Sequence, residues 1–544
     1  FEESLGGRKP MTNRVVLIGL DGGTFATLDA LMDEGVMPFL QAFLASGVRG
    51  ELLSVIPPLT PPGWASLVTG RTPGHHGVMD FFRFESPHHS YLRLVDSRDV
   101  KCETIWSIIS RQGLKATILN FPQMIPPRPI AGNAVPGWAP WRHLRRLCFP
   151  PDLFAKIKTV PGFNVQELAM DLQLEGRAIE GSSKDEYEDW IQFHIRREQQ
   201  WFQILHYLMQ EDPCDLTAVL FDGVDKLQHL LWRFIDPAYL PAHLSAWEQR
   251  IRELCLAYFR HLDGLIAETV AMAGPEASVF VASDHGFGPS TEVFYVNTWL
   301  HRQGYLAWAA DAPEDATEAG RLGLGMIRRA PVMVDWSRTT TYGLTPSSNG
   351  VHMAVAGRRG PHGIDPAEYE RVRSRLIEQL YQLTDPITGG RVVTQVWTRE
   401  EAFPGPQLDM APDLTLSLRD GGFVSILKSD VILRPRPEVV GTHRPQGVFM
   451  AKGPGIRQGL SLPPLSITDV APTLLYTLGL PIPKDLEGRV AAQILDPGAL
   501  QRSPIVVGEP TQIPEPYPQR SGHKEDKEGE AQVLERLKNL GYVE

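Results

Sequence analysis

Cysteine, long apolar runs and clustered positive charge are all scarce in this 544-residue sequence. The four cysteines, at positions 102, 148, 214 and 255, form no CxxC pair and no regular spacing, which excludes a disulfide framework and a thiolate zinc site. The first ten residues lack the apolar core of a secretory signal, and no stretch reaches the roughly 18 apolar residues of a membrane span. These features predict a cytoplasmic protein with no membrane span.

Positive charge is outnumbered as well as scattered. The chain has 53 Lys and Arg against 64 Asp and Glu, a net charge of −11. Because no dense Lys/Arg run offsets this charge, we expect no dedicated nucleic-acid surface. A small anionic substrate remains compatible with an acidic protein if metal ions supply the positive charge at the site. Hydrophobic residues make up 42% of the chain, which allows a large core and excludes general disorder.

Three apolar runs of strand length each end in acidic or imidazole side chains. Residues 14–20 end at Asp21, residues 216–221 end at Asp222-Gly223-Val224-Asp225, and residues 277–282 end at Ser283-Asp284-His285-Gly286. Continuous apolar runs are typical of buried parallel strands. Open α/β sheets bind ligands at the carboxyl ends of their strands. The sequence therefore predicts one site at the edge of such a sheet, assembled from distant segments.

The fold class we expect is α/β, with a central, mostly parallel sheet, helices on both faces and an inserted cap. Residues 186–209 have helical periodicity, and their aromatic stripe is predicted to pack in the core. One large domain is expected over residues 11–500. Residues 80–180 and 300–345 are candidate cap insertions, with plain surface loops as the alternative. Residues 503–544 are expected to form a C-terminal tail.

Single motifs leave the chemistry open. Asp225 and His229 stand four residues apart, so on a helix they share one face and could bind one metal ion. Such a pair is more often a helix cap and a partly exposed histidine. Asp222 competes with Asp225, but only Asp225 has the four-residue spacing to His229. Asp284-His285-Gly286 is a stronger signal at a strand end, with a tight turn as its alternative, and Asp21-Gly22-Gly23 can equally be a turn.

The segment after Asp21 changes this balance. It has Thr60 before a short helical pattern, which continues to Thr69-Gly70-Arg71-Thr72-Pro73-Gly74-His75-His76-Gly77. Here the sequence resembles the alkaline phosphatase superfamily and, within it, the type I phosphodiesterase/nucleotide pyrophosphatase group. The match continues in order through Asp21-Gly22, Asp225 with His229, Asp284-His285-Gly286, Gly441-Thr442-His443, residues 447–455 and residues 466–475. It spans about residues 14–80, 215–290 and 440–490.

The resemblance implies a phosphoric ester hydrolase with two divalent cations, usually zinc, although Asp/His sites also accept manganese or iron. It assigns one ion to Asp225, His229 and His443. It assigns the other to Asp21, Asp284 and His285, with the Thr60 oxygen as a further ligand. A threonine hydroxyl is a poor nucleophile unless a cation lowers its pKa. The implied reaction is therefore hydrolysis of a small phosphate ester, above all a diester, through a phosphothreonine intermediate on Thr60.

The chain also departs from this pattern. Nucleotide pyrophosphatases have an Asn three residues after the nucleophile, where this chain has Gly63. Either the Gly63 backbone N–H or another residue is therefore expected to bind substrate there. The missing side chain keeps a phosphomonoesterase or phosphotransferase on the same site as alternatives. A metal-stabilised binding or assembly module is a further alternative, which the retention of Thr60 opposes. Thr60 cannot form the formylglycine of sulfatases, so that chemistry is not expected.

Four conspicuous residues also have plain structural interpretations. His75, His76 and Trp64 are predicted to pack rather than to bind ligands, and Thr60 fits a helix N-cap as well as a nucleophile. The sequence leaves the identity of the substrate and the oligomeric state open.

Overall fold

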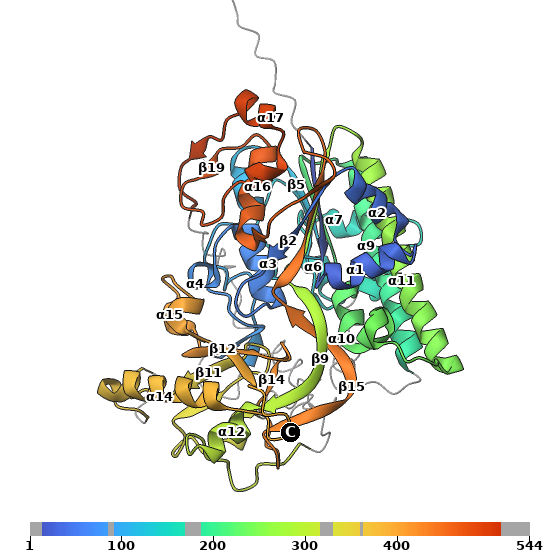
Figure 1. Cartoon of the computed structure of the whole chain (residues 1–544). Helices are drawn as coiled ribbons and strands as arrows, with labels where there is room; N and C mark the ends of the chain where they lie inside the picture. The colour runs from blue at the N-terminus through green and yellow to red at the C-terminus, as the bar shows by residue number, and fades with distance from the viewer. Residues whose placement is uncertain (1–13, 85–91, 169–185, 316–329, 359–362, 513–544) are drawn as a thin grey trace, which may run out of the picture.

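The computed structural model describes residues 14–84, 92–168, 186–315, 330–358 and 363–512. Within them, a nine-stranded sheet forms the centre of the molecule (Figure 1). Its strands run in the order β17 (Leu460–Ser461), β2 (Val48–Leu53), β16 (Gln446–Lys452), β8 (Ser278–Ala282), β1 (Val15–Leu20), β7 (Leu216–Phe221), β5 (Ala116–Leu119) and β6 (Gly132–Val135), and β18 (Leu465–Ser466) also pairs with β2. Only β16 runs antiparallel to its neighbours. The predicted mostly parallel α/β sheet is confirmed.

The three strands predicted from apolar runs are β1, β7 and β8. They are neighbours at the centre of the sheet, where Leu17 of β1 lies opposite Ala218 of β7 and Phe280 of β8. Both pairings are parallel, so the carboxyl ends of the three strands lie at the same edge. This edge carries the candidate site.

Helices cover both faces of the sheet because alternate side chains of each strand point to opposite faces. In β1, Ile18 packs into one apolar core and Leu17 into the other. The first core is closed by α1 (Phe25–Asp33), α2 (Pro38–Ala45), α9 (Glu186–Glu211), α10 (Gly223–Ile235) and α11 (Ala246–Ala273). The second is closed by α3 (Thr60–Thr69), α5 (Ile105–Arg111) and α16 (Val470–Thr477). Figure 1 shows these two layers to the right and left of the sheet.

The helix predicted over residues 186–209 is α9. Trp190 and Trp201 of its aromatic stripe are buried in the first core, as predicted. None of the helices described in the structure has the length and apolar character needed to cross a membrane.

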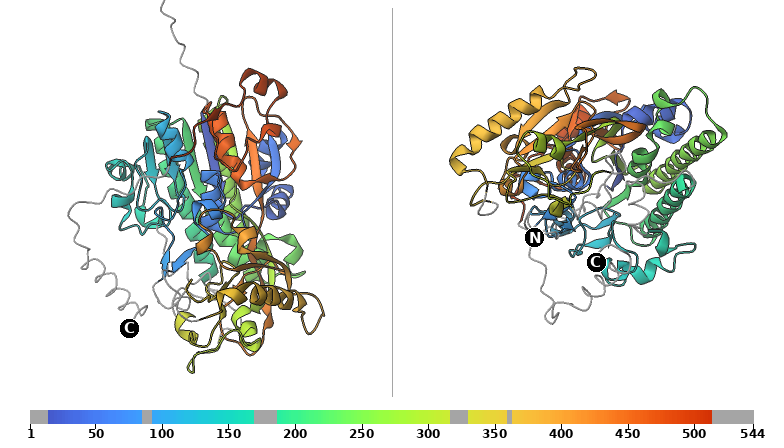
Figure 2. Two further views of the ribbon diagram at one scale, coloured as in Figure 1. Left: turned by 90° about the vertical axis from the view of Figure 1, so that its left-hand side faces the viewer. Right: turned by 90° about the horizontal axis from the view of Figure 1, so that it is seen from below.

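A second lobe lies below the main sheet in Figure 1 and toward the viewer in the right-hand view of Figure 2. Two long antiparallel strands, β9 (Gly286–Tyr295) and β15 (Leu433–Arg444), lead into it. It has its own apolar core and a four-stranded sheet in the order β10 (Thr341–Gly343), β11 (Gly350–Met353), β13 (Leu414–Leu418) and β12 (Val393–Thr398), with α12 (Val296–Arg302), α14 (Tyr369–Gln382) and α15 (Arg399–Ala402). The candidate insertion at residues 300–345 is one part of this lobe, and its residues 316–329 lie outside the described chain.

The candidate cap at residues 80–180 is not separate from the core over its whole length, because β5 and β6 belong to the central sheet. Each of these strands has only four residues, and a proline-rich segment separates them, so little in the sequence indicates a core strand here. The domain boundaries themselves stay predictions. The expected tail is described only as far as residue 512, where β20 (Val507–Gly508) pairs with β19 (Ile482–Pro483).

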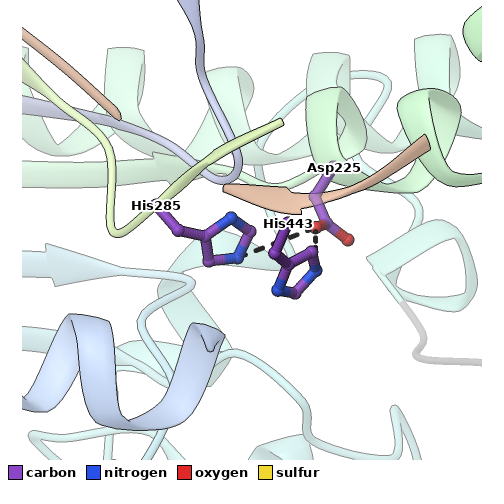
Figure 3. A group of neighbouring side chains, drawn as sticks. All are labelled: Asp225, His285 and His443. Carbon is purple, nitrogen blue, oxygen red and sulfur yellow. Dashed lines mark ion pairs between the residues drawn. The ribbon is translucent and has the colours of Figure 1, made fainter. Parts of the chain in front are cut away.

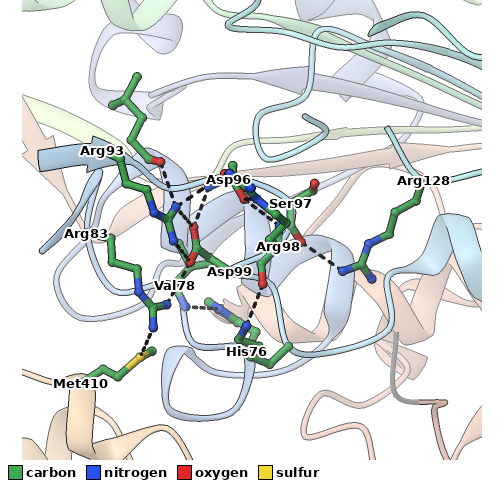
Figure 4. Close-up of polar contacts among 12 residues, drawn as sticks. His76, Val78, Arg83, Arg93, Asp96, Ser97, Arg98, Asp99, Arg128 and Met410 are labelled. Atoms are coloured by element: carbon green, nitrogen blue, oxygen red, sulfur yellow. Dashed lines mark hydrogen bonds and ion pairs between the residues drawn. The ribbon is translucent and has the colours of Figure 1, made fainter. Parts of the chain in front are cut away.

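The candidate cap at residues 80–180 begins with a hairpin of β3 (Phe82–Phe84) and β4 (Leu92–Leu94). The buried carboxylate of Asp99 holds this hairpin in place. Asp99 accepts hydrogen bonds from Arg83, at 2.9 Å, and from both terminal nitrogens of Arg93, at 2.6 and 2.7 Å (Figure 4). Burial alone would raise the pKa of Asp99, but the arginines hold this pKa below its usual value. The carboxylate therefore binds the hairpin to the loop before α5.

Candidate active site

Every predicted ligand lies at the carboxyl edge of β8, β1 and β7 or reaches it from a neighbouring element. Asp21 follows β1, Asp225 lies in the first turn of α10 after β7, and Asp284 with His285 follows β8. His443 arrives from β15, because its position pairs with Phe287 of β9, directly after the β8 tip. The fold thus gathers residues separated by more than 400 positions in the sequence.

Two groups of buried side chains in the described chain could each hold a metal ion. One is Asp21, Asp284 and His285, and the other is Asp225, His285 and His443. In each group, one candidate ligand atom of every residue lies within 4.8 Å of the others. Figure 3 shows the second group converging from α10, the loop after β8, and β15. His285 is shared, so the two groups adjoin.

The individual distances are short. His285 Nε2 lies 3.2 Å from Asp284 Oδ2 and 3.6 Å from Asp21 Oδ1. His443 Nε2 lies 3.3 Å from Asp225 Oδ1. Such spacing is close enough for each group to contact one ion after small adjustments.

His229 and Thr60 complete the arrangement. His229 Nε2 lies 3.0 Å from His443 Nε2 and 3.4 Å from Asp225 Oδ1, and the His229 side chain is 32% exposed. Thr60, the first residue of α3, places its Oγ1 3.2 Å from His285 Nε2. All seven predicted ligand residues therefore meet in one place. Their roles as ligands stay predictions.

The backbone fixes the orientation of all three imidazoles. Their Nδ1 atoms contact backbone carbonyl oxygens: His229 at Gly441 (3.3 Å), His285 at Gly286 (3.0 Å) and His443 at Pro58 (2.9 Å). A carbonyl oxygen only accepts hydrogen bonds, so Nδ1 carries the proton and donates, which leaves the Nε2 lone pair facing the site. Burial also lowers the pKa of His285 well below its usual range, and that of His443 in the same direction. Neutral imidazoles are the form that binds metal.

The carboxylates show why a cation fits here. Asp21 Oδ1, Asp225 Oδ1 and Asp284 Oδ2 are buried, and none has a hydrogen-bond donor among the described residues. Burial and the neighbouring carboxylates raise the pKa of Asp21 well above its usual value, and burial does the same for Asp284. Buried, unpaired carboxylate oxygens are costly unless a charge compensates them. A donor set of carboxylate oxygens and imidazole nitrogens fits first-row divalent cations.

Asp222, the competitor of Asp225, has other partners. Its Oδ1 accepts a hydrogen bond from Arg197 Nη1 at 2.5 Å and from Asn120 Nδ2 at 3.3 Å. Burial alone would raise the pKa of Asp222, but Arg197 keeps it below the usual value. This pairing supports the preference for Asp225, whose Oδ1 faces the imidazoles.

The start of α3 differs from the expectation that Thr60 caps the helix. Leu59, not Thr60, occupies the N-cap position, and the Thr60 hydroxyl points to His285 instead of capping the helix. The Gly63 N–H donates to the Leu59 carbonyl at 2.8 Å. A Cβ at Gly63 would lie 2.8 Å from the Asp284 carbonyl oxygen, so this glycine lets α3 approach the ligand loop closely. Substrate binding by Gly63 stays a prediction.

Trp64 and His76 pack in the interior as predicted, whereas His75 is only partly buried and lies near Glu487. Trp64 is buried with its ring 5.2 Å from that of Phe121. His76 is buried and accepts a hydrogen bond from the Val78 N–H at Nδ1 (Figure 4). It donates from Nε2 to Ser66 of α3 at 2.8 Å. Burial lowers the pKa of His76 to about 3, so it stays neutral.

Several supporting residues were not predicted. Ser54 Oγ donates to the Asp284 carbonyl at 2.5 Å, and the Gly22 N–H donates to Asp284 Oδ1 at 3.1 Å. Gln228 Nε2 donates to the Gly22 carbonyl at 2.9 Å. Gln228 directly precedes His229 in the sequence motif, and this position is the one signal that could have marked Gln228 as a supporting residue. No local pattern marks Ser54, which lies 230 positions from its partner.

The family model of type I phosphodiesterase / nucleotide pyrophosphatase matches residues 15–445. The chain belongs to this family. It is therefore an enzyme of the phosphoric ester hydrolase class, in a metal-dependent family of the alkaline phosphatase superfamily. No curated protein matches the sequence.

The solved structures that match the chain share little sequence with it. Murine ectonucleotide pyrophosphatase / phosphodiesterase 5 is 14% identical, with a TM-score of 0.49, over 89% of this chain and 100% of that one. Phosphonoacetate hydrolase from Sinorhizobium meliloti, in complex with phosphonoformate, is 18% identical with a TM-score of 0.49, over 87% and 97% of the two chains. The human ectonucleotide pyrophosphatase / phosphodiesterase 5 is 13% identical with a TM-score of 0.48, over 90% and 99%.

Proposed function

We propose that the protein hydrolyses small phosphodiesters, of the kind that nucleotide pyrophosphatases cleave, through a phosphothreonine on Thr60. The ligand sets proposed are Asp225, His229 and His443 for one cation, and Asp21, Asp284, His285 and Thr60 for the other, with zinc as the first choice. The observation that carries the proposal is the 3.2 Å contact of Thr60 Oγ1 with His285, the residue shared by both groups of candidate ligands.

Two divalent cations bound here would supply the charge that lowers the pKa of a hydroxyl and offsets the negative charge of the phosphoryl oxygens. Thr60 Oγ1 then forms a bond to phosphorus while the ester bond to the leaving alcohol or nucleotide breaks. Water next attacks the phosphothreonine, which releases the phosphorylated product and restores the hydroxyl. Thr60 is well placed because it opens α3, whose positive dipole end favours an anionic substrate.

The other residues of the chain hold this geometry. The carbonyls of Gly441, Gly286 and Pro58 keep the three Nδ1–H groups turned away from the reacting atoms. The Ser54 hydroxyl donates to the backbone carbonyl of Asp284, and the Gly22 N–H donates to its side-chain carboxylate. Attack by a positioned group depends on geometry of this kind, since misplacement by 1 Å can cost about 100-fold in rate.

Gly63 motivates a second candidate. It lacks the side-chain donor of the nucleotide pyrophosphatase pattern, and its N–H is already bonded to Leu59. A phosphomonoesterase or phosphotransferase reaction at the same Thr60 is the alternative that this difference favours. The ratio of kcat/KM for an aryl phosphodiester to that for the matching aryl monoester separates the two, because a diesterase gives a ratio above one.

The nucleophile assignment has a direct test. Hydrolysis of a chromogenic aryl phosphodiester, with zinc or manganese added, is compared between wild type and Thr60→Ala. Thr159→Ala, a change at an exposed threonine after α7 (Leu153–Ile157), serves as the control. We expect wild-type turnover that survives in the control and disappears in Thr60→Ala. Equal activity in all three proteins would defeat the assignment.

All four cysteines are free thiols in the structure, in keeping with the cytoplasmic location we propose. Fractionation of cells that produce the protein tests this location. Recovery from the culture medium or an extracytoplasmic compartment would contradict it.

A further inference from the structure

Directly behind the start of α10, helix α9 presents two adjacent charged residues to the protein interior. Arg197 and Glu198 are each only 1% exposed. Charged side chains are almost never buried this far without partners. Both have partners at the residues that precede Asp225, the first of the proposed ligands on α10.

Arg197 neutralises Asp222. The 2.5 Å bond from Arg197 Nη1 to Asp222 Oδ1 joins α9 to the tip of β7, and Asn120 at the end of β5 adds a second donor to the same oxygen. Asn120 has a φ of 67°, which is uncommon for a residue other than glycine. Three elements thus converge on the carboxylate that lies three residues before Asp225.

Glu198 holds the first turn of α10. Its Oε1 accepts the Gly223 N–H at 2.8 Å and the Tyr258 hydroxyl at 3.0 Å, the latter from α11. Gly223 is the first residue of α10, and its N–H has no partner within the helix itself. Burial, together with Asp222, raises the pKa of Glu198 to about 8.

The consequence for the site follows from position. Asp225 is the third residue of α10 and His229 lies one turn further on, so the first turn of the helix sets where both side chains point. Replacing Arg197 would remove the guanidinium bound to the Asp222 carboxylate, which lies three residues before Asp225. The Arg197–Asp222 pair therefore holds the end of β7 next to the start of α10, and Glu198 holds the Gly223 N–H of that first turn.

We propose that Arg197 and Glu198 are positioning residues for the Asp225 half of the site, which set the affinity for one of the two cations and not for the other. This inference rests on the proposed function, because it takes Asp225 and His229 as ligands. Outer residues that orient metal ligands typically change metal affinity by about 10- to 100-fold when replaced.

The experiment is a titration of metal-free protein with zinc in competition with a chromogenic chelator, which resolves two binding steps per chain. For Arg197→Met we expect one step weakened about 10- to 100-fold and the other unchanged. The matched control is Arg196→Met, at the preceding position of α9, where the arginine is exposed and pairs with Glu167. We expect the control to bind both ions as wild type does.

Paired variants separate positioning from general stability. Asp222→Asn alone removes the carboxylate that Arg197 Nη1 contacts and is expected to weaken the same step. The double variant Arg197→Met/Asp222→Asn removes both charges, so it is expected to bind more tightly than Arg197→Met alone. Glu198→Gln keeps an oxygen acceptor for the Gly223 N–H. We therefore expect it to bind zinc at the affected step more tightly than Glu198→Leu does.

The outcomes are distinct. If wild type shows two steps and Arg197→Met shows both unchanged, or both weakened equally, the inference is wrong while the proposed function stands. If wild type binds no ion, both are wrong. Should Arg197→Met fail to fold, Glu198→Leu is judged by the same criterion, one selectively weakened step.

Discussion

The Thr60 hydroxyl lies 3.2 Å from Nε2 of His285, whose Nδ1 is held by the Gly286 carbonyl. Because the Gly286 carbonyl fixes the His285 ring at Nδ1, the contact between Thr60 and His285 sets the position of the Thr60 hydroxyl relative to both groups of candidate ligands. The first prediction follows: Thr60→Ser keeps the reacting oxygen and retains measurable turnover, whereas Thr60→Ala loses about 1,000-fold or more. Steady-state hydrolysis of an aryl phosphodiester measures both. An alanine variant within about tenfold of wild type would contradict the prediction.

Removing a proposed ligand is expected to remove metal without unfolding the chain. Asp284→Asn and His443→Ala each lose bound metal and most activity. The metal-free fold survives because the change at Asp284 also relieves repulsion among buried carboxylates, the same repulsion that helps to raise the pKa of Asp21. Elemental analysis and circular dichroism test this, with His243→Ala, at an exposed position, as the control. Two ions per chain in both variants would show that the ligand set is wrong.

Gly22 is expected to be intolerant of a side chain. Its φ is 66°, and a Cβ there would lie 2.8 Å from the Phe287 ring, so Gly22→Ala combines backbone strain of about 1 kcal/mol with a clash beside Asp284. Gly113→Ala is the matched control, since Gly113 has a φ of 81° and a Cβ there would meet no atom within 4 Å. We expect Gly22→Ala to lose metal and activity, and Gly113→Ala to lose only a little stability. Similar metal content in both variants would argue against the packing explanation.

The Asp99 carboxylate is expected to make part of the stability dependent on pH. Its pKa is lowered in the folded protein, so its contribution is complete above about pH 4, the value for an unfolded Asp, and is lost as the pH falls through the lowered pKa. Asp99→Asn should therefore cost about 1–3 kcal/mol near neutral pH and less near about pH 3. Urea unfolding at both pH values measures this difference. Asp33→Asn, at the exposed end of α1, should show none.

The sequence was most informative where one segment carries its own pattern. The runs that became β1, β7 and β8 are continuously apolar because both faces of the strands are buried, so their ends could be predicted as one edge. The Asp225 and His229 spacing likewise depends only on the geometry of α10.

Features that depend on tertiary contacts could not be predicted. His443 reaches the site because β15 pairs with β9, a register that no local pattern encodes. The engagement of Asp222 with Arg197 joins a strand end to the middle of a 26-residue helix, so the sequence could only weigh Asp222 against Asp225 by spacing. The strands β5 and β6 were assigned to a candidate insertion because each has only four residues, which is too short for a periodic pattern that indicates a core strand.

The whole proposal for this site depends on a covalent phosphoryl intermediate at Thr60, and trapping that intermediate is the decisive experiment. Metal-loaded enzyme is mixed with an aryl phosphodiester, quenched with acid during turnover, digested and analysed by mass spectrometry. We predict a phosphoryl group, with or without its remaining ester substituent, on Thr60 and its absence from Thr60→Ala. Rapid turnover with an unmodified Thr60 peptide, or a phosphoryl group on another residue, would show that Thr60 is not the nucleophile.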